Sequence, residues 1–92
     1  VKKVRETFPP KHMEVSRSLT NYGRILIAMG KPAQAEPLLR EAVEIARGVF
    51  AKDNWRPAES QVFLGAALAQ QGRADEAARF LREGLREMNA VL

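Results

Sequence analysis

The chain has 92 residues, no cysteine and one histidine, with 15 Lys and Arg against 11 Asp and Glu and a net charge of +4. That length fits one small domain and excludes a multidomain enzyme within these residues. Without cysteine, disulfides, thiolate chemistry and cysteine-ligated zinc are all excluded. Hydrophobic residues make up 46% and charged residues 28% of the chain, as in an ordinary folded domain.

The sequence matches itself after a shift of 42 residues. In that register 12 of 50 aligned pairs are identical, against roughly three or four expected by chance. The matches include two glycine pairs and a Leu-Arg-Glu triplet: Gly23 with Gly65, Gly30 with Gly72, and 39–41 with 81–83. We therefore predict two repeats, at 13–54 and 55–92, preceded at 1–8 by the tail of another repeat's helix.

The first repeat has the pattern of two helices. Gly30 and Pro32 are the punctuation expected where one helix ends and the next begins. The second helix is expected to end near Lys52, and Asp53 or Asn54 can cap the helix after it. The first helix is predicted from an apolar stripe with spacings of three and four: Val15, Leu19, Tyr22, Ile25, Leu26 and Met29.

The second repeat follows the same order, with Gly72 at its turn. No segment alternates with period two for long enough to predict a strand. Small residues recur where two helices must approach closely, because a bulky side chain there would separate the helix axes. They are Gly23, Ala35 and Ala42 in the first repeat, and Gly65, Ala77 and Gly84 in the second.

At these positions the sequence resembles the tetratricopeptide repeat. The resemblance implies an all-α superhelix, here of two helical hairpins preceded by a partial helix. The 42-residue length, and the segment from Gly30 to Ile45, are similar to the kinesin-light-chain type. Trp55-Arg56 and Leu64-Gly65 also resemble the last repeat of bacterial proteins that join a Ser/Thr kinase domain to C-terminal repeats.

The same residues argue against catalysis, and we expect neither an enzyme nor a bound cofactor or metal. The single histidine, His12, is expected in the loop before the first helix, where it would cap or pack on the turn. The longest uncharged stretch, 62–72, is too short for a bilayer, which needs about 20 apolar residues. We expect a cytoplasmic protein without a membrane segment.

The family resemblance implies a concave groove, lined by the first helix of each hairpin, that binds a peptide or partner protein. Arg17, Asn21 and Arg24 lie on one helix face, where two guanidinium groups favour an acidic peptide. The alternative is that both arginines are merely solvated and Phe63 packs on a neighbouring helix. The groove candidates are Arg17, Thr20, Asn21, Arg24, Ile27, Glu59, Val62, Phe63, Ala66 and Gln70.

The sequence leaves two alternative functions, a basic helical nucleic-acid-binding domain and a purely oligomerising structural segment. Arg79, Arg82 and Arg86 share a helix face that could meet nucleic acid, but Glu83 and Glu87 lie among them, which favours a solvated face. A homodimer is expected to form through exposed apolar edges of the terminal helices, above all the edge of the last helix. That edge comprises Phe80, Leu85, Met88, Val91 and Leu92. The favoured function is a protein–protein interaction module of a larger bacterial regulatory or signalling protein, with a Ser/Thr kinase as one candidate.

Overall fold

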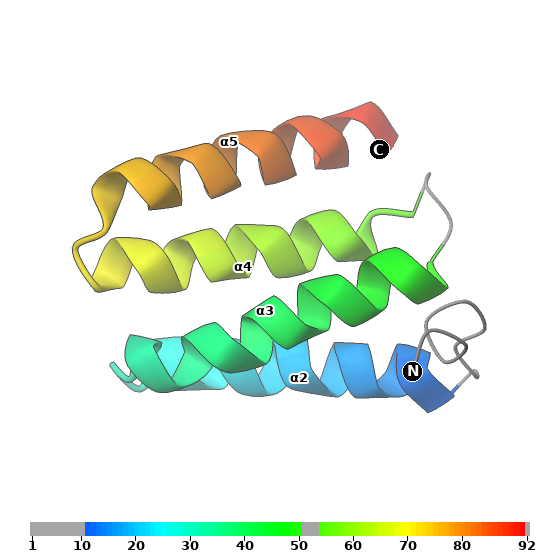
Figure 1. The fold of residues 1–92 in the computed structure, drawn as a ribbon, viewed down its shortest axis with the longest axis horizontal. Coiled ribbons are helices and arrows are strands. Elements are labelled where there is room, and N and C mark those ends of the chain that lie inside the picture. The colour runs from blue at the N-terminus through cyan, green and yellow to red at the C-terminus, as the bar shows by residue number, and fades with distance from the viewer. Residues whose placement is uncertain (1–10, 51–53, 92) are drawn as a thin grey trace.

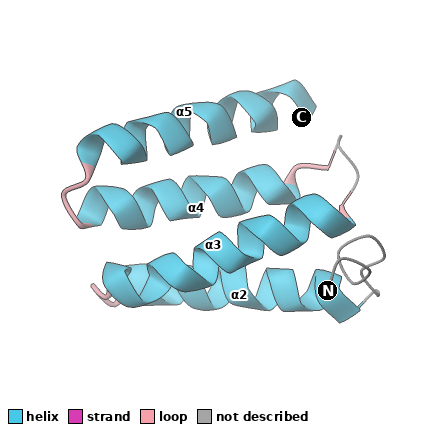
Figure 2. Ribbon diagram, in the orientation of Figure 1, coloured by secondary structure: helices cyan, strands magenta, loops and turns pink. Residues whose placement is uncertain are grey.

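The computed structural model describes residues 11–50 and 54–91. This part of the chain contains helices and loops and no strand (Figure 2). The helices are α2 (Lys11–Ala28), α3 (Pro32–Val49), α4 (Arg56–Gln70) and α5 (Ala74–Val91). They form two antiparallel hairpins with both tight turns at one end and the α3–α4 connection at the other (Figure 1). The predicted all-α hairpin fold is confirmed, and the partial helix predicted at 1–8 lies outside the described residues.

Two glycines close the hairpins. Gly30 and Gly72 have φ angles of 77° and 80°, a left-handed conformation that side chains with a Cβ rarely adopt. In the first turn, the Gly30 amide donates to Ile27 at 3.0 Å and the Lys31 amide donates to Leu26 at 2.8 Å. This is the double hydrogen bond of a Schellman motif, which satisfies carbonyls that the helix end leaves free. The predicted Gly turns are therefore confirmed.

The helix starts also follow from the local sequence. Pro32 lies in the first turn of α3, where its missing amide hydrogen costs no helical hydrogen bond. Before α4, the Asn54 side chain accepts a hydrogen bond from the Arg56 amide at 2.8 Å. Of the two predicted caps, Asn54 is thus the one observed to bond, and Asp53 lies outside the described residues. His12 falls inside the first turn of α2, because that helix begins earlier than the sequence suggested.

Within each hairpin the helices touch at glycine. A Cβ added at Gly23 would stand 2.6 Å from Leu39 Cγ, and one added at Gly65 would stand 2.8 Å from Leu81 Cγ. Both distances are too short for a methyl group, so only glycine lets the leucine of the second helix pack this closely. Leu39 is fully buried there, in a core shared by both hairpins.

The buried face of α2 differs from its apolar stripe. Ser16, Thr20, Gly23 and Leu26 are buried, with spacings of three and four along the helix. Of the predicted stripe, Leu26 is buried, Leu19 is half-buried and the remaining residues are exposed. The helix was predicted correctly, but serine, threonine and glycine occupy three of these four buried positions.

Glu36 joins the two hairpins. Its carboxylate accepts hydrogen bonds from Gln71 at 2.9 Å and from Arg73 at 2.8 Å, both on the α4–α5 turn. Arg40, one turn further along α3, donates to the other carboxylate oxygen at 2.7 Å. The hydrogen bond from Gln71, assisted by Arg40 and Arg73, lowers the pKa of Glu36 although partial burial opposes the shift. The charged form of Glu36 therefore stabilises the contact between hairpins.

We expect Gly23→Ala to lower the free energy of unfolding by about 1–3 kcal/mol, because the added methyl collides with Leu39. This loss should outweigh the gain in helix propensity of up to about 1 kcal/mol. Urea denaturation followed by circular dichroism measures it. In a Leu39→Ala background the same change should cost nothing, and an equal cost in both backgrounds would contradict the collision.

We expect Glu36→Gln to lower the free energy of unfolding at pH 7 by about 1–2 kcal/mol. Because the pKa of Glu36 is lower in the folded state, the unfolded state binds more protons, and its contribution exists above the unfolded pKa. The difference from wild type should shrink as the pH falls below about 4.5. Urea titrations at several pH values measure it. Glu41→Gln, at an exposed position on α3, is the control, and an equal effect of both substitutions would contradict the role of Glu36.

Candidate functional site

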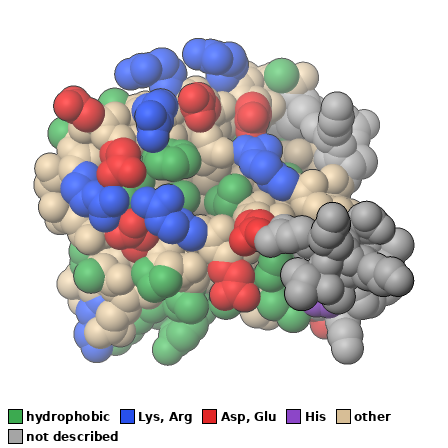
Figure 3. Space-filling view, viewed as in Figure 1, with side chains coloured by type: hydrophobic (Ala, Val, Ile, Leu, Met, Phe, Trp, Pro, Cys, Tyr) green, Lys and Arg blue, Asp and Glu red, His purple; other side chains and the backbone are tan. Residues whose placement is uncertain are grey.

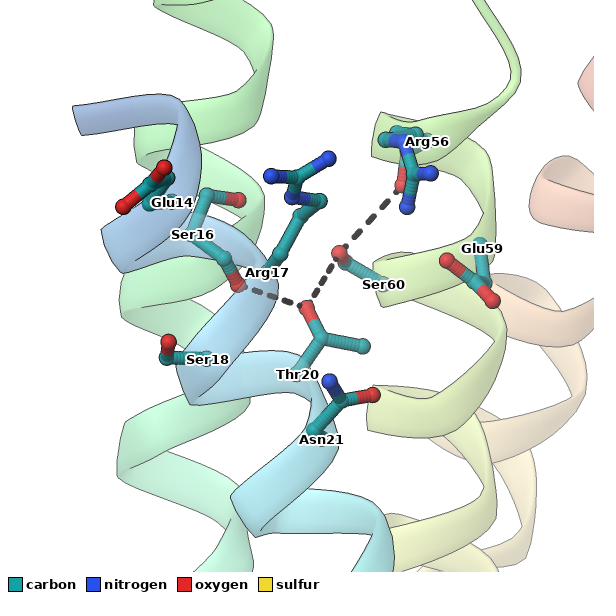
Figure 4. Close-up of a pocket in the computed structure, with 9 residues that line it drawn as sticks. All are labelled: Glu14, Ser16, Arg17, Ser18, Thr20, Asn21, Arg56, Glu59 and Ser60. Atoms are coloured by element: carbon teal, nitrogen blue, oxygen red, sulfur yellow. Dashed lines mark hydrogen bonds between the residues drawn. The ribbon is translucent and has the colours of Figure 1, made fainter. Parts of the chain in front are cut away.

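A polar cleft lies between α2 and α4, the first helices of the two hairpins. Its volume is about 460 Å³. Figure 4 shows Arg17 and Thr20 of α2 and Ser60 of α4 directed into the space between the helices, whereas Glu14 and Ser18 lie on the side of α2 away from α4. The lining residues are Glu14, Ser16, Arg17, Ser18, Thr20, Asn21, Arg56, Glu59 and Ser60. The cleft thus depends on how the hairpins are placed relative to each other.

Buried hydroxyl groups form the floor of this cleft (Figure 4). Thr20 Oγ1 and Ser60 Oγ are 2.8 Å apart and join α2 to α4. Thr20 Oγ1 also lies 3.0 Å from the Ser16 carbonyl oxygen, and Ser60 Oγ lies 3.3 Å from the Arg56 carbonyl oxygen. Because each hydroxyl has one hydrogen, one of the two donates to the other hydroxyl, which in turn donates to its own carbonyl. Ser16 Oγ donates to the Ala42 carbonyl of α3 at 3.1 Å. These bonds compensate the burial of polar groups and hold the two sides of the cleft at a fixed spacing.

Four charged side chains surround the floor. Arg17 from α2 and Arg56 from α4 bring two guanidinium groups to the cleft, and Glu14 and Glu59 bring two carboxylates. Within the part of the chain that the structure describes, no ion pair of 4 Å or less involves these four groups. Arg56 stands 4.5 Å from the centre of the Trp55 ring. Arg56 was missed from the sequence, because only the packing of the hairpins shows that the start of α4 borders Arg17.

Further along α2, the predicted Arg24 is exposed and lies 5.9 Å from the centre of the Phe63 ring of α4. It also donates to the Asn21 side chain at 3.4 Å. Phe63 is partly buried and packs against the core shared by the hairpins. Arg24 and Phe63 therefore lie together, and part of the Phe63 ring packs against the core.

The remaining groove candidates are placed less favourably for contact with a ligand. Thr20 is buried in the floor. Ile27 is partly buried against the core. Val62 packs toward α5, since its Cγ2 would lie 2.8 Å from a Cβ added at Gly84. Ala66 is half-buried and Gln70 is exposed at the end of α4.

The residues predicted at the apolar edge of α5 also differ in how exposed they are. Leu85 is exposed and Met88 is half-buried, whereas Phe80 packs against the core. The side chain of Val91 and the whole of Leu92 lie outside the described residues.

The arginine-rich face of α5 also carries acidic groups. Glu87 pairs with Arg47 of α3 at 3.1 Å, and Arg79 lies 5.4 Å from the centre of the Phe80 ring. This mixture of charges differs from a continuous basic surface for nucleic acid. We therefore locate the candidate site in the cleft between α2 and α4.

No cluster of three or more metal-binding side chains occurs among the described residues. Nor is any helix in residues 11–50 and 54–91 long and apolar enough to cross a membrane. The cleft offers hydroxyl, amide, guanidinium and carboxylate groups, which suit reversible polar binding.

Two stacked helical hairpins with a shared cleft define an all-α helical-repeat protein. The family model for the tetratricopeptide repeat matches residues 14–86, which is well over half of the chain. The chain therefore belongs to the tetratricopeptide repeat family, whose repeats generally mediate protein–protein interaction and are generally non-catalytic. Neither the curated proteins nor the solved structures compared with the chain give a significant match.

We expect Thr20→Val to lower the free energy of unfolding by about 1 kcal/mol, because Ser60 loses a buried hydrogen-bond partner. Ser18→Ala removes an exposed hydroxyl from the same helix and should change stability by less than about 0.5 kcal/mol. Thermal unfolding of both variants measures this. Equal stability of the two would show that the bond between the hairpins contributes little.

Proposed function

We propose that the cleft between α2 and α4 binds an extended, acidic segment of a partner protein. The observation that carries this proposal is the position of Arg17 and Arg56, which come from different hairpins and border one cleft. A carboxylate of the ligand can accept hydrogen bonds from both guanidinium groups. Such charge-assisted bonds are stronger than those between neutral groups.

The carboxylates of the cleft restrict which acidic segments fit. Glu14 and Glu59 would repel a peptide that is acidic at every position. They can instead accept hydrogen bonds from backbone amides or from a basic side chain of the ligand. The proposed ligand therefore has one or two acidic side chains in a mixed sequence rather than a polyacidic run.

The second contact lies further along the same pair of helices. Arg24 is exposed beside Phe63, whose ring is only partly buried. An apolar ligand side chain can pack on the exposed part of this ring while Arg24 bonds to a neighbouring ligand carbonyl. Two contacts along the helix pair favour an extended ligand over a single small anion.

We further propose that these repeats serve a larger cytoplasmic regulatory or signalling protein of bacterial origin. A Ser/Thr kinase is the parent that the resemblance at Trp55-Arg56 and Leu64-Gly65 favours. The 42-residue spacing supports the kinesin-light-chain type of repeat. In such a protein the cleft would recruit a partner, and catalysis would belong to another domain.

We expect peptides selected from a random displayed library on the wild-type chain to be enriched in Asp or Glu next to an apolar residue. Arg17→Glu and Arg24→Glu should each weaken the best selected peptide at least about tenfold, since each reverses a charge at the proposed contact. Fluorescence anisotropy of the labelled peptide measures the affinity.

Arg86→Glu is the matched control, because it makes the same charge change at an exposed position on α5. It should leave the affinity within about twofold, as expected for a charge outside the contact. Unchanged binding by Arg17→Glu and Arg24→Glu would contradict the proposed site. Equal weakening by all three substitutions would indicate only an effect of net charge.

A further inference from the structure

An exposed apolar face runs along α2 on the side away from the rest of the molecule. We call it the outer face of α2 and define it by Val15, Tyr22 and Ile25 together with Met29, the residue directly after the helix. Their exposed fractions are 40%, 56%, 50% and 59%. In Figure 3 hydrophobic side chains are exposed along the edge where α2 lies, whereas Lys and Arg side chains project from the opposite edge, at α5. Exposed Ser18 lies on the same face between Val15 and Tyr22. Large apolar side chains that are exposed together on one face generally mark an interaction site.

The repeat register gives each residue of this face a counterpart on α4. Adding 42 takes Val15, Tyr22, Ile25 and Met29 to Pro57, Leu64, Ala67 and Gln71. The first three counterparts are buried and Gln71 is half-buried. Ser18 is likewise exposed while its counterpart Ser60 is buried, whereas Gly23 and Gly65 are both buried. The main difference between the two helices is therefore that this face is covered on α4 and exposed on α2.

Helix α3 lies against that face of α4. Gln71, in the turn directly after α4, donates to Glu36 of α3, and Arg47 of α3 donates to Gln61, which is buried on α4. Between these two contacts α3 places Val43, which is half-buried against the core. The row Glu36, Val43 and Arg47 thus follows the side of α3 that meets α4.

The same row exists on α5 without a partner among the described residues. Adding 42 takes Glu36, Val43 and Arg47 to Ala78, Leu85 and Asn89. All three are exposed, and Leu85 has an exposed fraction of 54%. Helix α5 therefore presents outward the positions that α3 uses to cover α4.

From this correspondence we infer that the outer face of α2 binds α5 of a second copy of the chain. In this interface α5 of one copy packs on α2 of the next copy in the same way as α3 packs on α4 within one chain. In that register Tyr22 lies at the level of Leu85, and Met29 lies near Ala78 where the internal contact has Gln71 and Glu36. The contact between copies is accordingly more apolar than the internal one.

This interface is heterologous, because it joins two different faces. After two copies join, one α2 face and one α5 face remain uncovered by any described residue, at opposite ends of the pair. Such contacts continue into open stacks unless geometry closes them into a ring. The cleft between α2 and α4 uses another side of α2, at Arg17 and Asn21, so stacking leaves it open.

Two substitutions at exposed positions test the two faces of the proposed interface one at a time. Ile25→Glu places a charge on the outer face of α2, and Leu85→Glu places one on α5. Both positions are exposed, so circular dichroism should show unchanged folding. Ala28→Glu is the control on α2, because Ala28 and its counterpart Gln70 are both exposed and lie outside the contact. Sedimentation velocity over a wide range of protein concentration measures assembly.

The wild type and Ala28→Glu should form species that grow beyond the dimer as concentration rises, whereas each face variant alone should stay monomeric. An equimolar mixture of Ile25→Glu and Leu85→Glu should form a 1:1 dimer and nothing larger, because the mixture retains only one productive pair of faces. A monomeric wild type would overturn the inference. That is the outcome expected if residues 1–8, which the repeat register aligns with 43–50 at the end of α3, cover α2 within the same chain. Assembly of Leu85→Glu alone would also overturn the inference, because it would indicate a symmetric α2–α2 contact.

Discussion

The close packing of a leucine against a glycine is the constraint on which this structure depends. Leu39 reaches the backbone of α2 at Gly23, and Leu81 reaches the backbone of α4 at Gly65. Because both hairpins close in the same way, the second can follow the first at a nearly constant displacement. The core then lies along the contact between hairpins, and a chain of 92 residues gains a buried interior without a central globular core.

Features set by local backbone chemistry could be predicted from the sequence. Gly30 and Gly72 mark turns because their φ angles are left-handed, and Pro32 marks a helix start because its ring fits the first turn. Which side of α2 is buried could not be predicted from its apolar stripe. Ser16 and Thr20 occupy the buried side because their hydroxyl groups have hydrogen-bond partners there. Ser16 donates to the Ala42 carbonyl, and Thr20 bonds to the Ser60 hydroxyl. Hydrophobicity along the helix contains no information about those partners.

The candidate cleft was predictable only within one helix. Spacing along α2 places Arg17, Asn21 and Arg24 together, whatever else the chain does. The contribution of Arg56 depends on the distance between hairpins, which in turn depends on the leucine–glycine contacts and on the bond between Thr20 and Ser60. The same packing brings Glu14 and Glu59 to the cleft. It changes the expected ligand from a simply acidic peptide to one with carboxylates at particular positions.

Because the second hairpin repeats the first at a shifted position, the two ends of the structure expose different helix faces. The exposed apolar residues therefore follow from the fold. Helix α4 is covered because α3 precedes it, whereas the same positions on α2 remain exposed in the described chain. The polar cleft and the outer face of α2 lie on different sides of one helix, so binding at one leaves the other accessible. A further hairpin or second copy on the outer face of α2 would bury its apolar residues without occupying the side of the helix that carries Arg17 and Arg24.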